Sequence, residues 1–104
     1  MNTYSGSESD KLALGEGIAI LKFHATWCGP CKKLAPHVSK LASDISSNSS
    51  IVFFDVDIDE HPTLSERFDI EAVPTVIKLV NGKVDTRWVG GECNLQSIQK
   101  SLEK

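Results

Sequence analysis

The sequence predicts an α/β fold in which a mixed central β-sheet is flanked by helices on both faces. Short apolar segments that suit buried strands alternate along the chain with segments whose apolar residues recur at helical spacing. An Asn-Gly pair also separates the last two apolar segments, which indicates an antiparallel hairpin. Because 104 residues suffice for one compact core, we expect a single domain over residues 1–104.

The first half of the chain contains a predicted strand–helix–strand unit. Residues 18–25 are almost continuously apolar, which is typical of a strand buried on both faces. Apolar residues at i, i+3, i+4 and i+7 predict a helix over residues 31–45, which Pro36 should kink and the serine-rich residues 46–50 should end. A further apolar run at 51–57 predicts a strand parallel to the first.

The second half contains a predicted short helix, a hairpin and a final helix. A short helix is predicted over residues 62–68, with Pro62 in its first turn. Strands are expected at 75–80 and 84–89, joined by the Asn-Gly turn between them. Asn94 is the expected N-cap of the last helix, in which three apolar residues share one face. These are Leu95, Ile98 and Leu102.

Residues 1–17 are expected to hold a short strand and a helix that begins near Ser9 and is broken by the glycines at 15 and 17. This segment lacks the basic and apolar regions of a secretory signal, which predicts a cytoplasmic protein. A mature form already trimmed of its signal would have the same sequence.

Charge and hydropathy exclude several classes of partner. The net charge is −3 and no basic stripe is present, so nucleic acid is not expected to bind. No apolar run approaches the roughly 20 residues that span a bilayer, so no membrane partner is expected. No self-complementary apolar patch is visible, which favours a monomer.

Cys28 and Cys31 lie where the predicted strand leads into the predicted helix. Free N–H groups and the helix dipole favour a thiolate there, so Cys28 should be a nucleophile of lowered pKa. Cys31 falls on the apolar face one turn later and should be the protonated, resolving thiol. Gly29 would let a substrate backbone approach, and Pro30 fixes φ in the first turn.

The alternative for a Cys-x-x-Cys pair is half of a zinc site. A structural zinc site needs four ligands. The remaining candidates are Cys93, His24, His37 and His61, and none of them forms a second close pair. No metal is therefore expected, and the pair predicts thiol–disulfide exchange.

At these motifs the sequence resembles the thioredoxin family. Residues 25–32, Ala-Thr-Trp-Cys-Gly-Pro-Cys-Lys, are similar to the active-site motif, and Pro36 to the helix-kinking proline. Residues 73–75, Val-Pro-Thr, resemble a second motif, in which the proline follows a cis peptide bond. The Asn-Gly turn and Gly90 also lie at positions that match the family's pattern. The resemblance runs from residue 18 to the C-terminus, whereas residues 1–17 match weakly.

The resemblance implies a thioredoxin fold and a protein-disulfide reductase that a thioredoxin reductase recharges. Its partners would be that reductase and disulfide-containing protein substrates. It would bind no cofactor, because electrons come indirectly from NADPH. One alternative is a disulfide isomerase or oxidase, although those enzymes typically carry a His within the motif. The other alternative is a non-catalytic binding subunit that uses the same surface.

The resemblance also assigns residues around the cysteine pair. Trp27 would flank Cys28, with Asp59 as its hydrogen-bond partner. Pro74 would lie against the pair, and the backbone of Val73 could then bond to an extended substrate segment. The remaining members of the implied substrate surface are Thr75, Gly90 and Gly91.

Four residues need separate treatment. Where thioredoxins usually have a buried Asp and often a Lys, this chain has Lys22 and Asp55. In one arrangement they form a charge-reversed pair, and Asp55 or water acts as the base that deprotonates the resolving thiol. In the other arrangement Lys22 reaches solvent. His24 would either tune the site near neutral pH or be a hydrogen-bonded core residue. Cys93, near the rim of the substrate surface, is expected to be inert rather than a site of glutathionylation or of an intermolecular disulfide.

Overall fold

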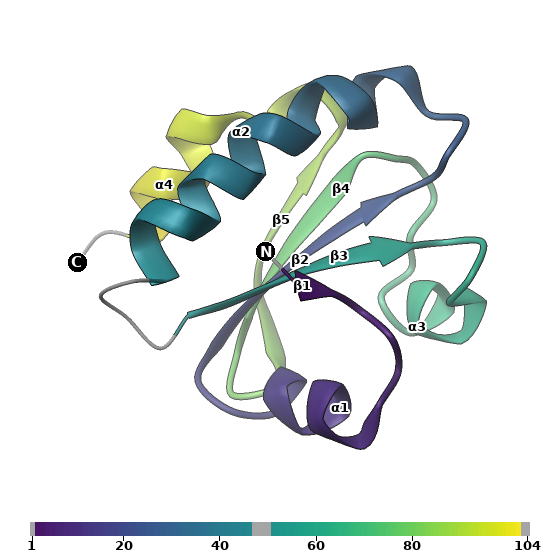
Figure 1. Cartoon of the computed structure of the whole chain (residues 1–104), viewed down its shortest axis with the longest axis vertical. Helices are drawn as coiled ribbons and strands as arrows, with labels where there is room; N and C mark the ends of the chain where they lie inside the picture. Colours follow the sequence, from purple (N-terminus) through teal and green to yellow (C-terminus); the bar gives the residue numbers. More distant parts are fainter. Residues whose placement is uncertain (1, 47–50, 103–104) are drawn as a thin grey trace.

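A computed structural model of the chain describes residues 2–46 and 51–102 and has a five-stranded mixed sheet with helices on both faces (Figure 1). The predicted fold class is confirmed. In chain order the elements are β1 (Asn2–Thr3), α1 (Glu8–Leu14), β2 (Ile18–His24), α2 (Gly29–Ser46), β3 (Val52–Asp57), α3 (Pro62–Arg67), β4 (Thr75–Val80), β5 (Lys83–Val89), a 3₁₀ turn (Gly90–Glu92) and α4 (Leu95–Leu102).

The strands are arranged in the order β1-β3-β2-β4-β5. β3 is parallel to both of its neighbours, as the strand–helix–strand order predicts, whereas β4 is antiparallel to β2 and β5. The turn between β4 and β5 places Asn81 at φ 50° and Gly82 at φ 84°. Both residues of a type I′ turn need positive φ, which explains the Asn-Gly pair.

Two apolar clusters lie on opposite faces of the sheet because side chains alternate along β2. Leu21 packs in one cluster with Leu14 of α1 and Leu64 of α3. Ile20 packs in the other with Val38 of α2 and with residues of α4. In Figure 1, α2 and α4 accordingly run side by side over one face of the sheet. The turn from β2 into α2, which contains Cys28, lies between this sheet and α2.

The predicted elements are present with shifts of one or two residues at their ends. α2 begins at Gly29 rather than at residue 31, because Pro30 has a φ that suits the first turn. α1 begins at Glu8, since the side chain of Ser7 accepts the N–H of Asp10 at 3.2 Å and caps the helix. α2 runs past Pro36, and residues 47–50, where it was expected to end, lie outside the described residues.

The expected cap of α4 is confirmed. The Ser97 N–H donates to Oδ1 of Asn94 at 2.9 Å, and Ile98 is fully buried against the sheet. No helix in the described part of the chain is long and apolar enough to cross a membrane.

Candidate redox site

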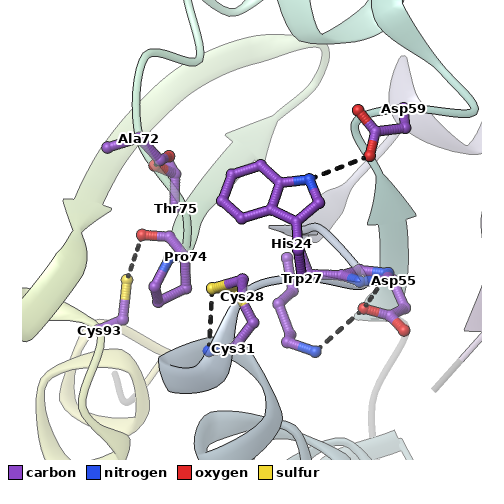
Figure 2. The surroundings of a disulfide bond; sticks show 11 residues. His24, Trp27, Cys28, Cys31, Asp55, Asp59, Ala72, Pro74, Thr75 and Cys93 are labelled. Carbon is purple, nitrogen blue, oxygen red and sulfur yellow. Dashed lines mark hydrogen bonds and ion pairs between the residues drawn. A yellow bond between two sulfur atoms is a disulfide. The ribbon is translucent and has the colours of Figure 1, made fainter.

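Cys28 and Cys31 form a disulfide at the N-terminus of α2 (Figure 2). The Cys28 N–H donates to the Ala25 carbonyl at 3.1 Å, which turns the chain from β2 into the helix. Cys28 therefore occupies the N-cap position, and its Sγ accepts the N–H of Cys31 at 3.2 Å. Unpaired N–H groups and the positive end of the helix dipole favour negative charge at this position. The site is thus built to stabilise a thiolate on Cys28 when the disulfide is reduced.

Trp27 is exposed beside the disulfide. Its side chain is 68% exposed, an unusual amount for a large aromatic residue. The indole Nε1–H donates to Oδ2 of Asp59 at 3.3 Å, so the expected hydrogen bond is present and orients the ring (Figure 2). An exposed apolar ring held in one orientation suits contact with another protein.

The loop before β4 packs against the cysteines. The Val73–Pro74 peptide bond is cis, as expected. The Val73 side chain packs against the small buried cluster that contains both cysteines. The Thr75 hydroxyl donates to the carbonyl of Ala72 at 2.6 Å and closes the loop. Within the described residues, the N–H and C=O of Val73 form no hydrogen bond, so both can bond to an extended peptide.

Three glycines border open space around this loop. A Cβ built at Gly29, Gly90 or Gly91 would meet no atom within 4 Å. Packing within the protein therefore does not require glycine at any of them. Gly90 has φ 58°, a conformation that favours glycine, and its N–H donates to the Pro74 carbonyl at 2.9 Å. The bare surface at Gly29 and Gly91 leaves room for a partner chain.

Lys22, Asp55 and His24 form one network on the sheet. Lys22 is 2% exposed, and its Nζ lies 3.1 Å from Oδ1 of Asp55. Nε2 of His24 lies 3.3 Å from the same oxygen. Of the two expected arrangements, the structure has the charge-reversed pair, and the alternative in which Lys22 reaches solvent is wrong. The reason is the register of β2 and β3, which pairs Lys22 with Asp55 directly.

Cys93 is buried beside the loop that carries Pro74. Its Sγ lies 3.2 Å from the carbonyl of Trp88 and 3.6 Å from that of Pro74. Burial raises the pKa of the Cys93 thiol to about 11, and the charge of Glu92 acts in the same direction. This environment matches the expected inert thiol and disfavours modification, because the thiolate is the reactive form.

One residue of the site was not expected from the sequence. Ile58 packs against the buried cluster of Ala25, Cys28 and Cys31. Its N–H also donates to the His24 carbonyl at 2.9 Å, which ties the turn after β3 to the end of β2. A single apolar residue in an acidic segment was its only signal.

Among the described residues, no group of three or more His, Cys, Asp or Glu could hold a metal ion.

Comparisons with known proteins agree with this geometry. The thioredoxin family model matches residues 5–104. The mitochondrial thioredoxin of Mus musculus is 37% identical over 95 residues, which cover 89% of this chain and 56% of that protein. The chain thus spans little more than half of that relative. Thioredoxin-2 of Saccharomyces cerevisiae is 39% identical over 99 residues, 94% of this chain and 90% of that protein. The X-ray structure of Fasciola hepatica thioredoxin matches with a TM-score of 0.82 at 27% identity, covering 98% of this chain and 96% of that one.

Proposed function

This chain belongs to the thioredoxin family, and on that premise we propose that it is a thiol-disulfide oxidoreductase that reduces disulfides in proteins. We propose further that a thioredoxin reductase recharges it with electrons that come indirectly from NADPH, so that the chain itself binds no cofactor. The observation that carries this proposal is the Cys28–Cys31 disulfide at the start of α2, where Sγ of Cys28 accepts the Cys31 N–H at 3.2 Å.

The proposed reaction is a two-step exchange. In the reduced protein, the Cys28 thiolate attacks one sulfur of a substrate disulfide, and the other sulfur leaves as a thiolate that takes a proton. Cys31 then loses its proton and attacks Sγ of Cys28. The mixed disulfide breaks, the second substrate sulfur is released as a thiol, and the Cys28–Cys31 disulfide forms. Two electrons have passed from the cysteine pair to the substrate.

The proposed substrate surface surrounds this pair. Trp27 offers an exposed apolar ring, and the unpaired backbone groups of Val73 could bond to an extended substrate segment as a neighbouring strand would. The open surface at Gly29 and Gly91 would let the substrate backbone come close to the sulfurs. Pro74, Thr75 and Gly90 act by holding the loop in place.

A cytoplasmic location and a monomeric state are also proposals. The matched relatives include mitochondrial thioredoxins, so a mitochondrial location is the other outcome of a localisation experiment. Fractionation of cells that express the tagged full-length protein tests the location. Analytical ultracentrifugation of the oxidised and reduced protein tests the monomer.

The first test is the reduction potential of the Cys28–Cys31 pair, measured by alkylation and mass spectrometry across dithiothreitol and glutathione buffers. A reductase is expected to give a value near about −270 mV, the value known for thioredoxin itself. A value near about −180 mV or higher would favour the isomerase or oxidase alternative instead.

The second test separates catalysis from binding alone. A Cys31→Ser variant should accumulate a mixed disulfide between Cys28 and its substrates and should lose turnover, because nothing then attacks the Cys28 sulfur. A Cys93→Ser variant is the matched control and should turn over like the parent, since Cys93 is buried and forms no disulfide. If the Cys31→Ser variant supports every function of the parent, the protein is a binding subunit.

A further inference from the structure

The network of Lys22, Asp55 and His24 is a buried charge cluster that the exchange reaction leaves unexplained. Oδ1 of Asp55 lies 3.1 Å from the Lys22 ammonium and 3.3 Å from Nε2 of His24. Lys22 is fully enclosed, whereas the side chains of His24 and Asp55 are 22% and 28% exposed. The carboxylate thus links an enclosed cation to an imidazole that reaches solvent.

This network lies on the same face of the sheet as the cysteines. Side chains alternate along β2, so Lys22 and His24 point to the side of Ile20, which packs against α2. His24 is the last residue of β2, and four residues later Cys28 caps α2. Cys31 points inward from that helix and is 2% exposed. The network and the buried cysteine pair thus share one end of β2 and one face of the sheet, where charges are screened less than in bulk water.

Only one member of this network can change charge readily near neutral pH. Lysine and aspartate side chains ordinarily stay charged there, so Lys22 and Asp55 cancel each other, whereas imidazole ordinarily changes charge between pH 5 and 8. Nε2 of His24 lies 3.3 Å from Oδ1 of Asp55, which is close enough for an ion pair when the imidazole is protonated on both nitrogens. The network is neutral with a neutral imidazole and carries one positive charge with an imidazolium.

The other charged groups around His24 are acidic on β3 and basic on α2. Asp57 is its register partner on β3, and Asp59 follows in the next turn. At the near end of α2 the charged side chains are the exposed Lys32 and Lys33. β4 contributes none opposite His24, since its pairing with β2 ends at Phe23 and Thr75.

We propose that His24 takes up a proton when the reduced cysteine pair forms its thiolate, with Asp55 and Lys22 holding the ring in position. The thiol loses one proton and the imidazole gains one, so the net charge of this end of the protein does not change. The coupling is reciprocal: an imidazolium stabilises the thiolate, and a thiolate stabilises the imidazolium. His24 is in this sense a positioning residue that sets the pH at which the thiolate forms. The inference rests on the proposed exchange chemistry and extends it.

The test is an NMR titration of the histidine rings in the oxidised and in the reduced protein. We expect the titration midpoint of His24 to lie at higher pH in the reduced protein than in the oxidised protein, because the negative charge of a thiolate favours an imidazolium. His61 is the internal control. It packs against Tyr4, which belongs to the cluster on the opposite face of the sheet, and its midpoint should be the same in both states. Equal midpoints for His24 in both redox states would overturn the proposal.

A variant gives the second arm of the test. His24→Asn keeps a polar side chain beside Asp55 but cannot take a proton, so ultraviolet titration of the Cys28 thiolate should move to higher pH. A His61→Asn variant should leave that titration in place. A purely structural role for His24 predicts no shift with either variant and would also overturn the proposal. Both experiments measure protonation and not turnover. A failure of the proposed reductase activity would be detected separately, in the reduction potential of the cysteine pair and in the assay of substrate reduction.

Discussion

At the scale of a residue, Cys93 links burial to pH. Its pKa is raised from the ordinary value of 9.0 to about 11, chiefly by burial. Between these values the unfolded chain has lost the thiol proton and the folded protein still holds it. The ionisation of Cys93 should therefore leave the free energy of unfolding unchanged below about pH 9 and should lower it as the pH rises from about 9 toward 11.

Chemical denaturation of the oxidised protein at a series of alkaline pH values measures this fall. The comparison is with a Cys93→Ala variant, in which the decline should be smaller. The slopes and not the absolute stabilities are compared, since loss of the buried sulfur itself lowers stability. Equal slopes for the parent and the variant would show that Cys93 ionises alike in the folded and unfolded states.

At the scale of an element, the start of α4 depends on one side chain. Oδ1 of Asn94 accepts the Ser97 N–H at 2.9 Å and satisfies one of the free donors of the first turn. We expect Asn94→Ala to lower the free energy of unfolding by about 1 kcal/mol, measured by urea denaturation. Asn94→Asp keeps the acceptor and is the matched control, with a much smaller expected loss. An equal loss in both variants would mean that the cap does not support the helix.

At the scale of the whole molecule, the two faces of the sheet should unfold together. Ile77 belongs to the cluster under α1 and α3, and Ile98 to the cluster under α2 and α4. Each is fully buried, so Ile77→Val and Ile98→Val should each cost about 1 kcal/mol. Because the sheet separates the two sites, the costs should add in the double variant to within about 0.5 kcal/mol.

Denaturation followed by both near- and far-ultraviolet circular dichroism measures these costs. One coincident transition is expected in all three variants. The control is Val84→Ala, a similar truncation at a side chain that is 46% exposed, which should change stability little. Separate transitions for the two probes would show that one face of the sheet can unfold without the other.

Taken by itself, the sequence determined those features that depend on neighbours a few residues apart. The periodicity of residues 31–45 predicted α2, the Asn-Gly pair predicted the hairpin, and Asn94 predicted the start of α4. The position of Cys28 at a helix N-terminus followed from the same local patterns. Such signals suffice because helix periodicity, turn geometry and capping each involve backbone and side chains within about one or two turns.

Only the tertiary structure decided how distant residues meet. Lys22 and Asp55 are 33 positions apart, and Trp27 and Asp59 are 32 apart. Both contacts bring β2, or the turn that follows it, together with β3 or the turn after it. From the sequence, two arrangements were open for Lys22, and Cys93 was expected near the rim of the substrate surface with no depth assigned to it. The register of the strands decides the first and the packing of the chain around Pro74 the second, because a side chain's direction depends on the strand and loop packed beside it.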